Sequence, residues 1–327
     1  MKALILREFN TPYEVQNVEK PVAGKSEVLV KVMASGVNPL DLKIIAGQAA
    51  HAKPILPAIL GIDMAGVIEA VGEDVSAFKT GDEVYGMTGG IAGVQGSLAE
   101  YSAVDPDLLA IKPKNLTMHQ AAALPLIFIT AWEGLVDRAK VSEGRKVLIH
   151  GGAGGVGHVG IQIARASGAT VFATASPEDH DLIRSYGATP IDYTSSHVDD
   201  YVREHTAGEG FDIILDTVGG AVLDASFKAV KQYTGHVVSV LGWGTHALAP
   251  LSFRGATYSG VFTLYPLISG KLRKHHGDIL REATKLAETG KLAPILDKES
   301  YTPETISAAY EDIKAGRTRG KVVISIQ

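Results

Sequence analysis

The rhythm of apolar and polar positions changes near residue 117. Before that point, short β-prone runs alternate with turn signals, and no helical period is longer than two turns. We expect strands at residues 2–6, 28–33, 65–71, 83–87 and 98–104. The first third of the chain is therefore predicted to form a β-domain.

Beyond residue 117, strand-like and helix-like runs alternate. We expect strands at 147–150, 170–173, 190–191, 211–215 and 236–240, and helices at 155–167, 177–186, 198–206 and 221–231. Such alternation is typical of a parallel sheet with right-handed crossovers. The predicted fold class is α/β, with a doubly wound parallel sheet following the β-domain.

The end of the chain changes character once more. An apolar strand follows Ser259, and further elements are expected at 277–289 (helix), 303–315 (helix) and 321–326 (strand). Because the closing strand resembles those of the first domain, we expect the C-terminus to return there. The predicted segments are a β-domain at 1–123, an α/β domain at 124–265 and a return segment at 266–327.

Composition narrows the class of protein. The 327 residues are 46% hydrophobic and 20% charged, which is enough to build two domains with their own cores. A net charge of −5 argues against a general nucleic-acid or anionic-membrane binder. The chain has no cysteine, which excludes disulfides, thiolate zinc sites and a cysteine nucleophile.

Neither the N-terminal residues nor the longest apolar run indicates a targeting signal or a membrane-spanning segment. Residues 1–8 lack the apolar length of a signal peptide, and the longest apolar run, at 121–132, contains Pro125 and is too short to span a bilayer. We expect a cytoplasmic protein.

A glycine-rich loop lies between the apolar strand at 145–150 and an amphipathic helix. In it, Gly152 permits a tight turn, Gly154 lets the backbone approach a pyrophosphate, and Gly157 lets the helix pack on the strand. Ala153, Gly155 and Val156 complete the loop. The helix N-terminus then faces the phosphates with free N–H groups. This pattern predicts a dinucleotide site at the carboxyl ends of the parallel strands, in the cleft between the domains.

The next strand indicates which dinucleotide binds. NAD-binding units usually end this strand with an acidic residue, whereas here it ends at Ala175 and Ser176. Ser176 leaves room and a hydroxyl for a 2′-phosphate, and the next helix supplies His180 and Arg184 as possible cationic partners. Glu178 and Asp179 would repel a phosphate, and Ser176 also suits a helix N-cap. We favour NADPH over NADH.

Several stretches over nearly the full chain resemble the zinc-independent quinone oxidoreductases of the medium-chain dehydrogenase/reductase superfamily, the group that includes zeta-crystallin. These stretches are 34–41, 61–67, 81–85, 96–101, 122–125, 130–132, the glycine loop, 216–220 and 320–323. The resemblance implies a GroES-like domain at 1–123, a Rossmann domain at 124–265 and a homodimer. It further implies NADPH-dependent reduction of a small-molecule acceptor, a quinone or an enone.

The resemblance also bears on metal. Zinc-dependent relatives have Cys where this chain has Asn38, and Gly-His-Glu where it has Gly61-Ile62-Asp63. The adjacent His275 and His276 are not spaced for one helix face. We expect no metal, and therefore no Lewis acid that could acidify an alcohol. Acceptors with a conjugated carbonyl become the favoured substrates.

Site residues follow from the resemblance. Asn38 is predicted to orient the nicotinamide and donate to an acceptor oxygen. Asp41 matches the family's acid, although a helix cap or an ion pair with Lys43 is the preferred interpretation. The predicted cofactor contacts are Thr130 near the nicotinamide, Tyr193 by the adenosine phosphate, Val218 and Gly242 near the ribose and nicotinamide, the Val261 and Phe262 backbone at the carboxamide, and Lys321 at the phosphates. Ordinary packing is the alternative for each.

One loop departs from the family pattern. Residues 43–51 contain no tyrosine, and Ile45 stands where many relatives have Arg. A phenolic proton donor from this loop is therefore in doubt; a reduced quinone could take protons from water instead. The main hypothesis is NADPH-dependent quinone reduction. The alternatives are NADPH-dependent reduction of α,β-unsaturated aldehydes or ketones, and an NADPH-binding structural or regulatory protein.

Overall fold

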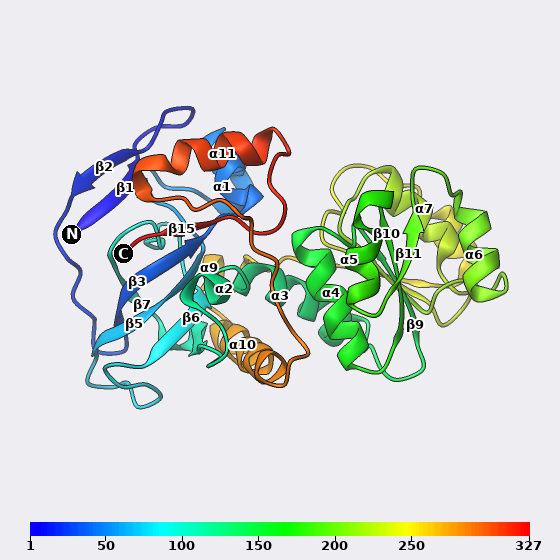
Figure 1. The fold of residues 1–327 in the computed structure, drawn as a ribbon, viewed down its shortest axis with the longest axis horizontal. Coiled ribbons are helices and arrows are strands. Elements are labelled where there is room, and N and C mark those ends of the chain that lie inside the picture. Colours follow the sequence, from blue (N-terminus) through cyan, green and yellow to red (C-terminus); the bar gives the residue numbers. More distant parts are fainter. The chain divides into compact units, whose positions relative to one another are not determined.

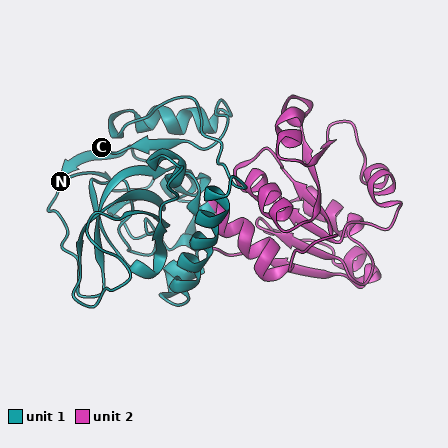
Figure 2. Ribbon diagram, turned by 60° about the horizontal axis from the view of Figure 1, so that its bottom comes forward, with its two compact units in different colours: residues 1–126, 264–327 teal, residues 127–263 magenta.

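The chain, described over residues 1–327 by a computed structural model, consists of two compact units (Figure 2). Unit 1 comprises residues 1–126 and 264–327, and unit 2 comprises residues 127–263. The boundaries expected at 123/124 and 265/266 thus fall at 126/127 and 263/264. The end of the chain belongs to the same unit as its beginning.

Unit 1 is built on antiparallel strands (Figure 1). The larger sheet has the order β15-β3-β5-β6-β8, with β7 also paired to β3, and a small sheet has the order β2-β1-β4. The strands are β1 (Lys2–Leu6), β2 (Glu14–Asn17), β3 (Val28–Gly36), β4 (Ala58–Ile59), β5 (Asp63–Val71), β6 (Glu83–Met87), β7 (Tyr101–Val104), β8 (Leu109–Ile111) and β15 (Val323–Ser325). Val30, Val32, Met64 and Ile68 pack in its core.

Short helices surround these sheets. They are α1 (Pro39–Ile45), α2 (Met118–Ala122), α9 (Tyr265–Ser269), α10 (Arg273–Glu288) and α11 (Ile306–Lys314), with 3₁₀ turns η1 (Ala50–Ala52), η2 (Pro106–Leu108) and η5 (Pro303–Thr305). The hydroxyl of Tyr85 on β6 donates to the carbonyl of Leu280 at 2.7 Å, which ties α10 to the sheet. No helix in the chain combines the length and apolarity that a membrane span requires.

Unit 2 contains a six-stranded parallel sheet of order β11-β10-β9-β12-β13-β14. Its strands are β9 (Lys146–His150), β10 (Thr170–Ala175), β11 (Thr189–Asp192), β12 (Ile213–Asp216), β13 (His236–Ser239) and β14 (Thr257–Gly260). The strand order reverses beside β9, as in Rossmann folds. The predicted α/β class, with a GroES-like antiparallel part and a Rossmann parallel sheet, is confirmed.

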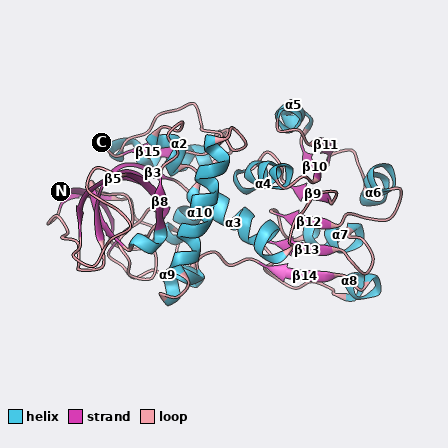
Figure 3. Ribbon diagram, turned by 90° about the horizontal axis from the view of Figure 1, so that it is seen from below, coloured by secondary structure: helices cyan, strands magenta, loops and turns pink.

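Helices cover both faces of the parallel sheet (Figure 3). Figure 3 shows α3 (Pro125–Trp132) and α4 (Gly155–Ala166) on one side and α6 (Val198–Thr206) and α7 (Ala221–Ala229) on the other. The remaining helical segments are the π-helical η3 (Glu133–Arg138), the 3₁₀ turn η4 (Pro177–Asp179), α5 (His180–Ser185) and α8 (Ala249–Arg254). Phe172, Ile214, Tyr201 and Phe227 form a buried core under α6 and α7.

Several elements differ from the expected ones. Strand β3 continues to Gly36 rather than residue 33, because its last residues pair with both β5 and β15. Residues 39–45 form helix α1, which was not predicted within the β-prone first third of the chain. Helix α10 begins at Arg273 instead of 277. Strand β12 runs to Asp216, so that this carboxylate lies at the end of a central strand.

Candidate active site

The carboxyl edge of the parallel sheet gathers most of the predicted cofactor residues within unit 2. The last residues of four adjacent strands, namely His150, Asp216, Ser239 and Gly260, are in register across β9, β12, β13 and β14. The glycine loop follows β9 and Ser176 follows β10, while Val218, Gly242 and the pair Val261 and Phe262 follow β12, β13 and β14. Parallel pairing brings these segments to one edge.

The glycine loop has the shape of a phosphate cradle. A Cβ added to Gly152 would lie 2.7 Å from the Cβ of Ala173, and one added to Gly157 would lie 2.0 Å from the carbonyl oxygen of Gly151. Close packing of the loop on β10 and of α4 on the loop therefore requires glycine at both positions. Gly154 differs, since a Cβ there would meet only the Gly151 oxygen, at 3.2 Å. Its open side fits the approach of a pyrophosphate to the N-terminus of α4.

Asp216 organises the neighbouring turn. Its Oδ1 accepts the N–H groups of Val218 at 3.0 Å and Gly219 at 2.9 Å, and its Oδ2 accepts the Ser239 hydroxyl at 2.7 Å. The carboxylate thus fixes the backbone that carries Val218 and joins the ends of β12 and β13. In the sequence, Asp216 was noted only within the stretch 216–220, and no role was predicted for it. An acid at the end of an apolar strand, three residues before Gly219-Gly220, is the signal that could have identified it.

His150 closes β9 as a neutral side chain. Its Nδ1 lies 3.2 Å from the Thr174 hydroxyl, which also accepts the Gly151 N–H at 3.1 Å. The Thr217 hydroxyl donates to the His150 carbonyl at 2.7 Å. Burial lowers the pKa of His150 to about 4, against the opposing effect of Asp216. The start of the glycine loop is therefore held by hydrogen bonds that do not change at neutral pH.

Thr130 on α3 belongs to a small polar group with Glu133 on η3 and Thr263 in the chain after β14. Its hydroxyl lies 3.1 Å from that of Thr263, which donates to Glu133 Oε2 at 3.3 Å. Glu133 begins the π-helical segment that follows α3. Such segments occur frequently at functional sites. Thr263 was missed in the sequence because no motif contains it.

At the predicted adenosine end, the Ser176 hydroxyl donates to Asp179 Oδ2 at 3.3 Å. Arg184 pairs with the exposed Asp181 at 2.8 Å. The Nε2 of His180 is buried and has no hydrogen-bond partner. Of the side chains predicted near the 2′-phosphate, His180 alone keeps an unused polar atom. A phosphate oxygen is a fitting partner for that atom.

A second acid lies beside this place. Asp192 ends β11 opposite Ala175, and its carboxylate accepts the hydroxyls of Thr194 and Ser195, each at 2.7 Å. These hydrogen bonds lower the pKa of Asp192. Tyr193, which follows, is exposed. The negative charge of Asp192 works against phosphate binding and increases the importance of His180.

The remaining predicted contacts lie on the turns after β12, β13 and β14. A Cβ at Gly242 would lie 2.1 Å from the Tyr258 hydroxyl, so a larger residue there would require the Tyr258 side chain to move. The Val261 N–H donates to the Ser239 carbonyl at 3.1 Å, and Val218 and Phe262 are largely exposed. Their roles toward a cofactor stay predictions.

Unit 1 contains a second polar cluster, formed by Asn38, Asp41, Asp63 and Lys321. Asn38 follows β3 at the N-terminus of α1, and Asp63 opens β5 opposite Gly36. Lys321 comes just before β15, which pairs antiparallel to the same end of β3. The sheet register therefore brings three distant segments together. All four side chains are buried.

Hydrogen bonds connect the whole cluster. The Lys321 ammonium donates to Asn38 Oδ1 at 2.5 Å and to the Val37 carbonyl at 2.6 Å. Asn38 Nδ2 donates to Asp63 Oδ2 at 2.9 Å, and the Leu126 N–H donates to Asp63 Oδ1 at 2.9 Å. An amide between an ammonium and a carboxylate has its orientation determined by both neighbours.

Asp41 caps α1, as the preferred interpretation predicted. Its Oδ2 accepts the backbone N–H of Asn38 at 2.8 Å. Burial raises the pKa of Asp41 to about 7 and that of Asp63 to about 6, and the Lys321 ammonium opposes both shifts. Burial also lowers the pKa of Lys321 against the two acids. One buried ammonium thus offsets the negative charge of only one of the two carboxyl groups. Because both acids have pKa values near 6 to 7, the cluster can hold an additional proton near neutral pH.

This geometry bears on two predicted roles, those of Asn38 and Lys321. The Asn38 amide donates to Asp63 and, at 3.4 Å, to the Gly36 carbonyl, so neither of its hydrogens is left for an acceptor oxygen. Lys321 was expected at the phosphates; its ammonium here lies in the unit 1 cluster. The phosphate contact stays a prediction.

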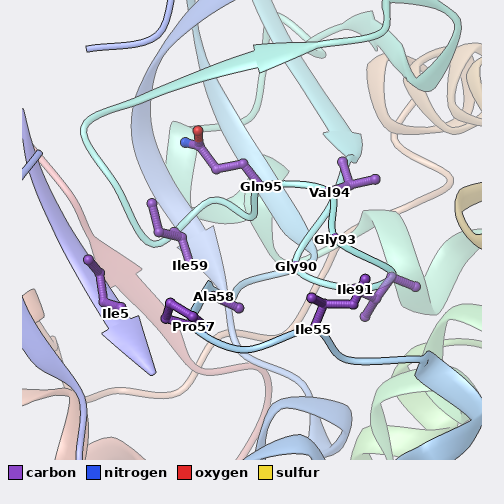
Figure 4. Close-up of a pocket in the computed structure, with 10 residues that line it drawn as sticks. All are labelled: Ile5, Ile55, Pro57, Ala58, Ile59, Gly90, Ile91, Gly93, Val94 and Gln95. Atoms are coloured by element: carbon purple, nitrogen blue, oxygen red, sulfur yellow. The ribbon is translucent and has the colours of Figure 1, made fainter. Parts of the chain in front are cut away.

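Unit 1 also has an apolar hollow of about 300 Å³ (Figure 4). Its walls come from β1, β4 and the loop at 90–95, and include Ile5, Ile55, Ile59 and Ile91. The labelled side chains in Figure 4 include one polar group, that of Gln95, which donates to the Tyr101 carbonyl at 2.7 Å. No titratable group lines the hollow, so it offers no acid–base chemistry.

Two domain families match the chain. Residues 24–114 match the alcohol dehydrogenase GroES-like domain, and residues 186–324 match a family described as zinc-binding dehydrogenase. The side chains form no group of three or more His, Cys, Asp or Glu that could hold a metal ion. The absence of zinc stays a prediction, which elemental analysis tests.

Curated relatives and solved structures extend these matches. The NADPH-dependent alkenal/one oxidoreductase of Arabidopsis thaliana is 37% identical, over 94% of this chain and 74% of the relative. The quinone oxidoreductase of Sus scrofa is 31% identical, over 99% of this chain and 97% of the relative. A solved alcohol dehydrogenase superfamily protein from Novosphingobium aromaticivorans is 56% identical, covers 100% of both chains and superposes with a TM-score of 0.97.

Two glycine substitutions distinguish a role in dinucleotide binding from a role in packing. Gly154→Ala adds a methyl with one close neighbour, so it costs about 1 kcal/mol or less of unfolding free energy, yet it weakens dinucleotide binding about tenfold. Gly157→Ala collides with the Gly151 carbonyl and costs about 2 kcal/mol or more. Urea denaturation and fluorescence titration with NADPH measure the two effects. Unchanged affinity in Gly154→Ala would contradict the cradle.

The buried carboxyl of Asp41 makes stability depend on pH. Its folded pKa of about 7 lies above the unfolded value, so its contribution is full below about pH 4 and is lost as pH rises through 7. The Asp41→Asn variant has no carboxyl group at this position, so it does not lose stability in this way as the pH rises. The unfolding free energy of the variant relative to wild type should therefore rise by on the order of 2 kcal/mol between about pH 5 and pH 8.

Urea denaturation at several pH values measures that difference. Asp181→Asn, at an aspartate whose side chain is 98% exposed, is the matched control and should show no comparable trend. A difference between Asp41→Asn and wild type that stays constant with pH would show that the carboxyl is ionised throughout.

Proposed function

The chain belongs to the quinone oxidoreductase group of the medium-chain dehydrogenase/reductase superfamily, and from this membership we propose that it reduces quinones with NADPH. Both named relatives are oxidoreductases, and the name of the Arabidopsis thaliana protein specifies NADPH. The choice of NADPH and of a quinone is the finer part of the proposal. The observation that carries it is the phosphate cradle at Gly152–Gly157 with the unpaired His180 beside β10.

The residues of unit 2 fit a dinucleotide. The open face of Gly154 and the N-terminus of α4 would hold the pyrophosphate, and Asp216 holds the turn at Val218 in place. When bound, the reduced nicotinamide supplies a hydride to an acceptor. The chain contributes a fixed geometry for that transfer, through hydrogen bonds that neutral pH does not disturb.

Support for NADPH comes from the end of β10. No carboxylate follows Ala175 directly, and Ser176 offers a hydroxyl where a 2′-phosphate would lie. His180 supplies the polar atom that has no partner within the protein. The nearby Asp179 and Asp192 oppose an anion, so a preference for NADPH would depend on His180 as the partner of the 2′-phosphate.

Support for a conjugated acceptor comes from unit 1. Asn38 stands where zinc-dependent relatives have Cys, and Gly61-Ile62-Asp63 stands where they have Gly-His-Glu. The Asn38 amide is hydrogen-bonded to Asp63 and to the Lys321 ammonium. An amide, a carboxylate and an ammonium are poorly suited to bind Zn²⁺ together, and alcohol oxidation usually requires such an ion. Reduction of an enone is the second candidate, because the alkenal/one reductase matches at higher identity than the quinone reductase.

We also propose a homodimer. Strand β14 ends the parallel sheet, and most of its residues are exposed. An unpaired edge of this kind can extend a sheet by pairing with a second chain.

Turnover tests the function directly. Purified protein should oxidise NADPH in the presence of an ortho-quinone, at ordinary enzymatic rates of about 1 s⁻¹ or more, and NADH more slowly. Absorbance of the reduced cofactor measures both. Turnover of a 2-alkenal alone would move the assignment to the second candidate. Binding of NADPH without consumption of either acceptor would favour the binding-protein alternative.

Cofactor preference should follow the charge at residue 180. His180→Lys places a permanent cation beside the predicted 2′-phosphate and should raise the ratio of kcat/KM for NADPH over NADH about tenfold, whereas His180→Ala should lower it. Steady-state kinetics with both cofactors gives the ratio. The control is Arg184→Ala, since that guanidinium is already paired with Asp181. Equal ratios in all variants would place the phosphate elsewhere.

A further inference from the structure

The loop that follows β13, residues 241–248, is fixed at its first residue. The Leu241 N–H donates to the Ser239 hydroxyl at 3.2 Å, and that hydroxyl donates to Asp216 at 2.7 Å. A Cβ added to Gly219 would lie 2.5 Å from the Leu241 carbonyl oxygen, so the turn after β12 packs directly against this residue. The start of the loop is therefore held against the end of β12.

A side-chain pair holds the far end of the loop. His246 Nδ1 lies 2.8 Å from Asp224 Oδ1 in the first turn of α7, the helix that follows β12 (Figure 3). The imidazole also packs edge-on against Phe227 of the same helix, with ring centroids 6.4 Å apart. The side chain of His246 is 12% exposed, and that of Asp224 is 51% exposed. Both ends of the loop are thus attached to the segment 216–224.

The two attachments are connected through Trp243. Its N–H donates to the Leu241 carbonyl at 2.8 Å, and its own carbonyl lies 3.4 Å from His246 Nε2. Gly242, predicted to border the ribose and nicotinamide, lies between these hydrogen bonds. The position of that predicted contact therefore depends on His246.

Both hydrogen-bond partners of the imidazole are acceptors. The Asp224 carboxylate and the Trp243 carbonyl have no hydrogen to donate. An imidazolium has two N–H groups and can serve both partners, whereas a neutral imidazole has one. Loss of the proton from His246 therefore removes one of the two hydrogen bonds, together with the positive charge of the pair.

We propose that Asp224 and His246 are positioning residues for the dinucleotide, which hold residues 242–245 at the carboxyl edge while His246 carries its proton and release them when the proton is lost. The inference rests on the proposed function, because the ligand is the nicotinamide and ribose half of the proposed cofactor. All the residues involved belong to unit 2.

The surrounding groups favour the protonated imidazole. The hydrogen bond to Asp224 raises the pKa of His246 above its ordinary value, and the charge of Asp216 adds to this effect. Tyr258 stays uncharged because burial raises its pKa, and the exposed Lys228 on α7 is screened by solvent. Since the folded pKa is raised, the attachment is complete below the ordinary histidine value of about 6.5 and is lost as pH rises through the folded value.

Fluorescence of Trp243 tests the attachment without any cofactor. The chain has two tryptophans, and Trp132→Phe leaves Trp243 as the only one; Trp132 stacks on Phe128, so another phenyl ring suits its place. In this background, the rate constant for acrylamide quenching should rise about twofold between about pH 6 and pH 9, because residues 242–245 are released. The Asp224→Asn variant should show the higher value at both pH values.

The matched control is Asp200→Asn. Asp200 lies on α6 of the same unit, has a side chain 52% exposed and pairs at 2.7 Å with Arg203, whose charge does not change in this pH range. This variant should follow the parent protein at every pH. Quenching that does not change with pH, or an Asp224→Asn variant that behaves like Asp200→Asn, would overturn the proposal.

Binding of NADH tests the positioning role. This cofactor lacks the 2′-phosphate, so the charge of His180 does not enter the comparison. Its dissociation constant, measured by calorimetry, should rise about threefold from about pH 6 to pH 9 in the wild-type protein, because the binding-competent fraction falls. His246→Gln keeps an amide donor but cannot take a charge, so it should bind NADH more weakly than wild type at pH 6 and show no change with pH.

A dissociation constant for NADH that stays constant while the quenching changes would also overturn the proposal. If the wild-type protein binds neither NADH nor NADPH at any pH, the proposed function itself fails. If it binds and reduces with either cofactor, and His246→Gln retains the wild-type pH dependence, this inference alone fails.

Discussion

The hydrogen bond between the Lys321 ammonium and the Asn38 amide joins the segment just before the last strand, β15, to the residue that follows β3 and begins α1. Burying an ammonium and two carboxyl groups is expensive unless each is paired. Here the Lys321 ammonium donates to Asn38 Oδ1 at 2.5 Å and to the Val37 carbonyl at 2.6 Å, and the Asn38 amide donates to Asp63 Oδ2 at 2.9 Å. The pairing of β15 with β3 keeps Lys321 at this position, so the return of the chain to unit 1 and the chemistry of the cluster depend on each other.

Unit 2 meets a different constraint, which is steric. Parallel strands end at one edge, and a phosphate can approach that edge only where side chains are absent. Gly152 and Gly157 provide the necessary close packing, and Gly154 leaves the surface open. Neutral His150, Thr174 and the buried Asp216 hold the flanking turns. The cofactor edge thus relies on packing and neutral hydrogen bonds, whereas the unit 1 cluster relies on charge.

Local patterns were sufficient to predict much of this. The change from period-two strands to alternating strands and helices indicated both folds, and the spacing of Gly152, Gly154 and Gly157 located the cradle. Helix α1 was missed because its seven residues are too few to show a period. Thr263 was missed because its partner Thr130 lies 133 residues away and no motif links them. The resemblance implied a phosphate contact for Lys321, and no local pattern indicated its hydrogen bond to Asn38.

The sequence by itself therefore determined the alternation of strands and helices in unit 2, the glycine loop and the lack of cysteine ligands, because each is a property of neighbouring residues or of composition. The tertiary structure alone decided which distant side chains are hydrogen-bonded to one another. Asn38, Asp63 and Lys321 converge through the antiparallel register of β3, β5 and β15, and that convergence in a buried place changes the pKa of each ionisable group. Burial and proximity arise only when distant segments pack, and so no local pattern carries them.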